Sequence, residues 1–198
     1  MPDGIIFGMD EIFGTDESHD LVHRMRAWAL ADAEERGIRL PEPATDEQIA
    51  ATEALLGYAL HPLLKRLYRE VANGCFGPDT WRLMPIERLT MCPRTDVAAG
   101  GRRRWPDQVV AVMDVGCGML SAVDCDPGGD GQVLLMDPNA FDCGEPEAWS
   151  VDTATLAQWL EGWLDGTSWL VDENPDIEEI GWPVRWADAA ARLGISAG

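Results

Sequence analysis

Lysine and arginine are missing from the segment that runs from Trp105 to Val184. The same segment contains seventeen aspartates and glutamates, so it carries −17 of the formal net charge of −20. Because proteins bind phosphate through Lys and Arg, this composition disfavours direct DNA or RNA binding. It favours either solubility alone or a protein partner with a basic surface. We interpret Arg102, Arg103 and Arg104 as a solvated loop or as an internal counterpart to the acidic half.

Long hydrophobic runs and paired cysteines are also missing. The apolar runs near the N-terminus are too short to cross a bilayer, and Asp3 stands where a signal peptide needs positive charge. We therefore expect a cytoplasmic protein with no membrane contact. The five cysteines are scattered without a CxxC pair, which argues against a disulfide framework and against a zinc site. We expect most of them to be small buried hydrophobic residues.

The motifs of the common catalytic sites are absent as well. Neither GxSxG nor a Walker A motif occurs, and all three histidines lie within the first 61 residues, far in sequence from the acidic half. His19 and His23 are one helical turn apart, but no third metal ligand is evident. We expect no catalytic residues, no metal and no cofactor. A hydrolase that uses clustered carboxylates with a divalent metal remains the least favoured alternative.

One loop in the acidic half imitates a metal site. Asp124, Asp126 and Asp130 have part of the spacing of a calcium loop. However, Gly128 replaces one expected ligand and Leu135 replaces the closing glutamate. A hairpin loop between two strands explains this stretch better.

Caps and an apolar period of about 3.6 predict helices in the N-terminal part. An amphipathic helix is predicted over about residues 17–36. In residues 45–78, Thr45 and a glutamine three positions later form a capping box, and Gly57 suits the end of that helix. Pro62 suits the first turn of the next helix, whose apolar residues recur at the i, i+3, i+4, i+7 spacing. This stretch therefore predicts a helical hairpin.

After the hairpin the pattern changes from helical to extended. Three short apolar runs are predicted as strands, at 109–113, 119–123 and 132–136. Their connections are too short for a crossover helix, which predicts an antiparallel meander. Asp152 or Thr153 is predicted to cap a last amphipathic helix that ends at Gly166. The predicted fold class is α+β, with N-terminal helices, a central antiparallel sheet and a C-terminal amphipathic helix packed on it.

Two ordered stretches resemble the SUKH superfamily, which comprises bacterial immunity proteins and related fungal regulators of cell-wall synthesis. The first is carried by Glu53, Leu56-Gly57, Leu60-His61-Pro62, Leu67-Tyr68 and Asn73-Gly74. The second is WPDQVVAVMDVGCGMLSAVDCDPGGDGQVLLMD, together with the helix VDTATLAQWLEGWLDG. The resemblance spans about residues 41–166 of what we expect to be a single domain over 1–198. An N-terminal arm and helix (1–40) and an acidic C-terminal extension (167–198) lie outside it.

The resemblance implies a non-catalytic immunity protein that binds a toxin, often a nuclease, and blocks its active surface. An acidic face suits a basic partner of this kind, because opposite fields accelerate encounter. The alternative is a regulatory interaction module that docks on an endogenous protein. Partner contacts are predicted on the sheet and its loops, at Trp105, Asp124, Asp126, Asp137, Asp142, Glu145, Glu147 and Trp149. The oligomeric state stays open.

Overall fold

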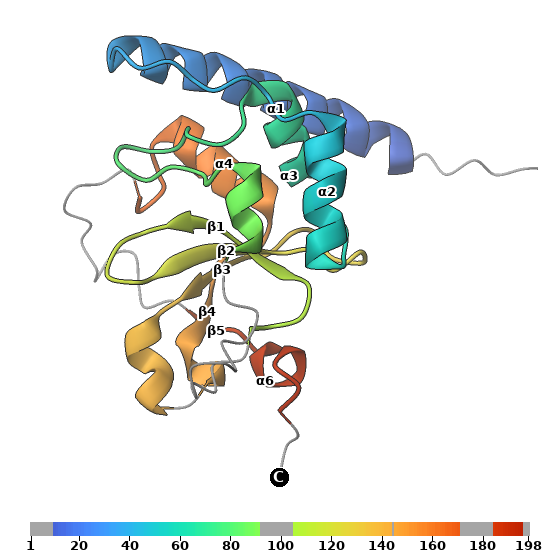
Figure 1. Ribbon diagram of the computed structural model, residues 1–198, viewed down its shortest axis with the longest axis vertical. Helices are drawn as coiled ribbons and strands as arrows, with labels where there is room; N and C mark the ends of the chain where they lie inside the picture. Colours follow the sequence, from blue (N-terminus) through green and yellow to red (C-terminus); the bar gives the residue numbers. More distant parts are fainter. Residues whose placement is uncertain (1–9, 92–104, 144, 171–183, 196–198) are drawn as a thin grey trace, which may run out of the picture.

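The computed structural model describes residues 10–91, 105–143, 145–170 and 184–195. In this part of the chain, five strands form one antiparallel sheet in the order β1-β2-β3-β4-β5. Helices α1 to α4 lie on one side of the sheet, and α6 lies on the other (Figure 1). This arrangement confirms the predicted α+β class. None of the described helices is both long enough and apolar enough to cross a membrane.

The first helix is longer than the predicted one. Helix α1 spans Asp10–Glu35 and buries Leu21, Met25 and Ala29 against the core. These residues are three or four positions apart, so the apolar stripe faces the other helices as expected. Beyond the helix end, Gly37 adopts the left-handed conformation, with φ +64°.

The capping box at the start of helix α2 (Asp46–Leu56) is present as predicted. The Thr45 hydroxyl accepts a hydrogen bond from the Gln48 amide, and the Gln48 side chain accepts one from the Thr45 amide. Glu53 interrupts the apolar stripe of this helix because its carboxylate has another task. It accepts a hydrogen bond from the Leu60 amide at 2.8 Å and pairs with Lys65 at 3.1 Å, which secures the turn into the next helix.

Helix α3 (Pro62–Arg66) continues into a π-helical turn, Leu67–Val71. Pro62 stands in its first turn as predicted, and the apolar side chains of the two segments are buried. The buried Tyr68 hydroxyl donates a hydrogen bond to the Met84 carbonyl at 2.7 Å. The second half of the hairpin is thus tied to the segment that leads towards the sheet.

The chain turns at Asn73 and Gly74 and packs against the segment 83–86. The Asn73 side-chain oxygen accepts a hydrogen bond from the Ile86 amide at 2.8 Å. Gly74 has φ +67°, and a Cβ built on it would lie 2.4 Å from the Met84 carbonyl oxygen. Only glycine fits this position, because it meets both the left-handed conformation and the close backbone approach. A 3₁₀ turn, Ile86–Thr90, follows.

The three predicted strands are confirmed to within one residue or so. They are β1 (Val109–Asp114), β2 (Leu120–Asp124) and β3 (Val133–Met136). The predicted turn between β1 and β2 has positive φ at Gly116, Cys117 and Gly118. Two further strands, β4 (Trp149–Thr153) and β5 (Val184–Arg185), were not predicted. Strand β5 has two residues, too few to give an alternating pattern.

Side chains alternate between the two faces of the sheet. Val133 and Leu135 face the helices, whereas Leu134 and Met136 join a second core with Trp149 and Trp186. Helix α4 (Leu156–Asp165) covers the first face and ends at Gly166 as predicted. Its cap is Thr155 rather than Asp152 or Thr153, since the Thr155 hydroxyl accepts from the Gln158 amide at 3.1 Å. Helix α6 (Ala189–Arg192) covers the second face.

Two glycine substitutions separate backbone strain from steric conflict. Gly37→Ala meets nothing within 4 Å, so its cost is the left-handed conformation alone, about 1 kcal/mol. Gly74→Ala has a similar φ but also meets the Met84 carbonyl, and we expect it to lower the free energy of unfolding by roughly 3 kcal/mol or more. Urea unfolding of both variants measures the difference. Equal losses would mean that the segment 83–86 moves aside freely, contrary to this account.

Candidate partner-binding surface

The carboxylates predicted to bind a partner lie at opposite ends of the sheet. In the pairing of β2 with β3, Leu120 lies opposite Met136 and Val123 lies opposite Val133. Asp124 therefore leaves the sheet at one end and Asp137 at the other. A strand of this length rises about 3.3 Å per residue, which separates the two ends by roughly 15 Å. Asp126 follows Asp124 at the first end, whereas Asp142, Glu145 and Glu147 belong to the connection between β3 and β4, which starts at Asp137.

Asp124 and Asp126 form ion pairs with an arginine of the same chain. The Arg192 guanidinium on α6 lies 2.6 Å from the Asp124 carboxylate and 3.3 Å from that of Asp126. The Asp124 side chain is 14% exposed and that of Asp126 is 51% exposed. Sequence reasoning missed Arg192, and nothing in the local pattern indicates a partner 68 residues away. In this region Asp130 is exposed and, within the described residues, has no ion-pair partner.

At the other end, a neighbouring residue engages Asp137 and a distant arginine engages Glu147. Asp137 accepts hydrogen bonds from the backbone amide and the side-chain amide of Asn139, both at 2.9 Å. Glu147 forms an ion pair with Arg185 at 3.3 Å. Glu145 is half-buried. The Asp142 side chain lies outside the described residues.

The two predicted aromatic anchors differ in exposure. Trp149 is fully buried, and its ring lies 4.8 Å from that of Trp105 in an edge-to-face arrangement. The expectation that Trp149 is a surface anchor is therefore corrected, because its ring belongs to the second core. Trp105 is half-buried and donates a hydrogen bond from its indole to the Val109 carbonyl at 2.6 Å. Its indole nitrogen thus reaches the start of β1, opposite Asp124, while its ring packs on Trp149 of β4.

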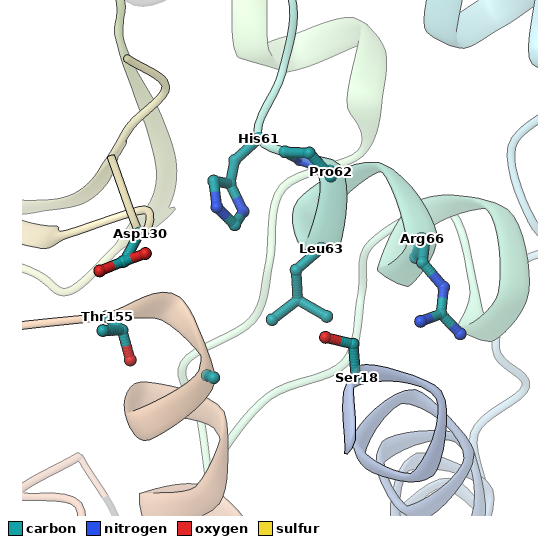
Figure 2. A pocket seen from close by; sticks show the side chains of 8 residues that line it. Ser18, His61, Pro62, Leu63, Arg66, Asp130 and Thr155 are labelled. Carbon is teal, nitrogen blue, oxygen red and sulfur yellow. The ribbon is translucent and has the colours of Figure 1, made fainter. Parts of the chain in front are cut away.

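A shallow hollow of about 490 Å³ lies between α1, α3, α4 and the β2–β3 loop. It is lined by Ser18, His61, Pro62, Leu63, Arg66, Asp130, Thr155 and Ala157. Figure 2 shows Asp130 and Thr155 on one side of the hollow and Arg66 on the other, with Leu63 between them. The Arg66 guanidinium is committed to Glu70, which it contacts at 2.7 and 3.1 Å.

Ser18, His61 and Asp130 line this hollow without forming a catalytic relay. A serine–histidine–aspartate relay needs hydrogen bonds from nucleophile to base and from base to carboxylate. No hydrogen bond joins these three side chains, and the buried Nδ1 of His61 has no hydrogen-bond partner among the described residues. Burial lowers the pKa of His61, although Asp130 and Asp124 oppose that shift. Gly131 packs against the ring, since a Cβ there would lie 2.9 Å from it.

Groups that could hold a metal are not assembled either. Within the described residues, no cluster of three or more His, Cys, Asp or Glu side chains has the geometry of a metal site. In the loop that imitates a calcium site, two of the three aspartates contact Arg192 instead. Arg102, Arg103 and Arg104 lie outside the described residues.

Asp152 is a half-buried acid whose surroundings the sequence did not indicate. Its carboxylate accepts hydrogen bonds from the indoles of Trp159 at 3.0 Å and Trp169 at 3.1 Å. It thereby links β4 to α4 and to the segment that follows α4. Burial raises the pKa of this carboxyl, and the two indole hydrogen bonds only partly counter that effect.

The raised pKa of Asp152 predicts a pH-dependent contribution to stability. Folding favours the protonated acid, so its contribution is largest below the pKa of the unfolded chain and is lost as pH rises through the folded pKa. Asp152→Asn cannot ionise. The free energy of unfolding of Asp152→Asn, measured relative to that of the wild type, should therefore increase as pH rises from about 4 to 7.

Urea unfolding followed at several pH values measures this shift. Asp165→Asn is the matched control, because it removes an exposed carboxyl from α4, the helix to which Asp152 is hydrogen-bonded through Trp159. Its difference from wild type should vary less with pH. A pH-independent difference for Asp152→Asn would contradict the prediction.

Comparison with known proteins places this architecture. A comparison with curated proteins gives no match. The sequence model of the SMI1 / KNR4 family (SUKH-1) matches residues 43–162. The matched region begins just before α2 and ends within α4, so it contains the helical hairpin and strands β1 to β4 but neither α1 nor α6. Because this match covers more than half of the sequence, the chain belongs to the SMI1 / KNR4 family (SUKH-1).

Proposed function

We propose that this protein is a non-catalytic immunity protein of the cytoplasm that binds and neutralises a basic toxin, namely a nuclease whose active surface attracts phosphate. The observation that carries the proposal is the charge distribution within a family of protein-binding domains. The segment 105–184 holds seventeen acidic residues and no Lys or Arg. A surface of this sign is complementary to a nucleic-acid-binding site and can occupy it.

Internal ion pairs leave much of this charge uncompensated. Arg24 pairs with Glu161, Arg185 with Glu147, and Arg192 with Asp124 and Asp126. Asp130 and Asp137 have no Lys or Arg partner among the described residues. The acidic half therefore keeps a negative field that would steer a basic partner towards it and would weaken with salt.

We place the contact surface at the end of the sheet that carries Asp124, Asp126 and Asp130. The residues from Asp126 to Asp130 are all exposed, whereas Asp137, Glu145 and Glu147 at the other end are half-buried. Trp105 adds part of an aromatic ring beside the start of β1. An aromatic side chain next to exposed charge is a common anchor in protein interfaces.

Capture of a partner tests the proposal. The full-length protein is immobilised and exposed to native cytoplasm and to the product of the adjacent gene, at low salt and at roughly 0.5 M salt, where the screening length is a few ångströms. We expect a basic nuclease domain that is retained at low salt and weakened at high salt. An endogenous partner without toxic activity would instead identify a regulatory module, and the absence of any partner would contradict both functions.

Charge variants at the two ends locate the contact. Asp126→Asn with Asp130→Asn removes two charges at the proposed end, and Asp137→Asn with Glu145→Gln removes two at the opposite end. Because the change in net charge is equal, a difference in Kd reports position. We expect the first pair to weaken binding about tenfold and the second by about threefold or less. The reverse order would move the contact surface to the Asp137 end.

A further inference from the structure

The Arg192 side chain occupies a receptor for a guanidinium group. Its Nη2 atom contacts Asp124 at 2.6 Å and the Asp107 carbonyl at 2.7 Å, its Nε atom donates to the same carbonyl at 3.0 Å, and its Nη1 atom contacts Asp126 at 3.3 Å. The guanidinium carbon lies 5.7 Å from the centre of the Trp186 ring. Two carboxylates, a carbonyl and an aromatic face are the groups that a planar guanidinium prefers.

This receptor lies at the proposed contact end and is open to solvent on one side. The Arg192 side chain is 20% exposed and Asp126 is 51% exposed. A basic side chain from outside can therefore approach the carboxylates that Arg192 holds. The occupant is long and flexible, so it can swing away from them without a change in the backbone.

Other contacts hold α6 in place without the guanidinium. Trp186, Ala189 and Leu193 are buried in the second core with Trp149. The Trp186 amide donates to the Trp149 carbonyl at 3.0 Å, and the Asp107 amide donates to the Arg192 carbonyl at 2.9 Å. The Arg192 side chain is thus not the main attachment of the segment that carries it.

We propose that Arg192 is an internal competitor for an arginine of the basic partner. In the free protein it neutralises Asp124 and Asp126. On binding, the partner's guanidinium takes the two carboxylates and the Trp186 face, and Arg192 turns out to solvent. This inference rests on the proposed function, because it assumes that the partner is basic. It adds that the C-terminal segment, which lies outside the family match, sets the affinity of the site.

A labelled peptide of alternating Gly and Arg tests the receptor without any knowledge of the toxin. Fluorescence anisotropy at about 50 mM salt gives its Kd for each full-length variant. Arg192→Gln should lower the Kd by about five- to tenfold, because it frees both carboxylates. Arg185→Gln is the matched control: it removes the same charge from the same segment, but Arg185 pairs with Glu147. It should lower the Kd by about twofold or less.

The double variant Asp124→Asn with Arg192→Gln tests whether Asp124 is the carboxylate responsible for the tighter peptide binding. Its Kd should return to about the wild-type value. Equal effects of Arg192→Gln and Arg185→Gln would overturn the proposal, as would a gain that survives the loss of Asp124. In either case Arg192 would be only a structural tie.

Arg192→Lys keeps the inference testable if Arg192→Gln loosens the segment. Hydrogen exchange of the Trp186 amide reports whether α6 remains docked in each variant. Lysine keeps the charge but cannot bridge the three acceptors in the same way, so Arg192→Lys should bind the peptide more tightly than wild type but less tightly than Arg192→Gln. A docked Arg192→Lys variant with the wild-type Kd would contradict the inference.

The two proposals fail separately. If the peptide shows the Asp124-dependent gain but no basic toxin is captured, the receptor stands and the immunity function falls. If a toxin is captured but its Kd responds equally to Arg192→Gln and Arg185→Gln, the function stands and the competition falls.

Discussion

The close backbone contact between Asn73–Gly74 and the segment 83–86 joins the helical half of the protein to the sheet. On one side of this joint, Gly74 lies against the Met84 carbonyl, and Tyr68 donates to the same oxygen. On the other side, the Met84 amide donates to the Val112 carbonyl of β1 at 2.8 Å, and Leu83 bridges to Met113. Among the hairpin residues that carry the family resemblance, Tyr68, Asn73 and Gly74 lie at this joint, and Glu53 and Leu60 form the turn between the two helices. These five residues therefore specify the local fold through backbone and side-chain contacts.

Structural features were predictable when residues close in sequence determine them, and were missed when contacts between distant residues determine them. Features set by neighbouring residues were predictable: the Thr45 capping box, the Gly57 and Gly166 helix ends, and the first three strands. The cap of α4 was misplaced because Asp152, Thr153 and Thr155 are all good capping residues and local pattern does not rank them. Strand β5 has two residues, so only its pairing with β4 defines it.

The candidate site was less predictable than the fold because its geometry depends on distant partners. The acidic residues were identified by composition, but the sheet register sends them to opposite ends. Tryptophan serves both as an interface anchor and as a core residue, so the residue type of Trp149 does not reveal its burial. That burial follows from the packing of α6 on the second face of the sheet. Within the described part of the chain, the cations that pair with the acidic segment come from both flanks of the family match. Arg24 lies on α1, whereas Arg185 and Arg192 belong to the C-terminal segment. Among the described residues, the flanking segments therefore supply cations to the acidic segment 105–184, which has no Lys or Arg of its own.

The packing of Trp186, Ala189 and Leu193 on the outer face of the sheet also bears on where the folding unit ends. The family match stops within α4, yet Leu134, Met136 and Trp149 would lose their cover if the chain ended there. A shortened protein would present an apolar sheet face to water, and such a face promotes self-association. In this family member the solubility of the shared core thus depends on residues that the shared core does not contain.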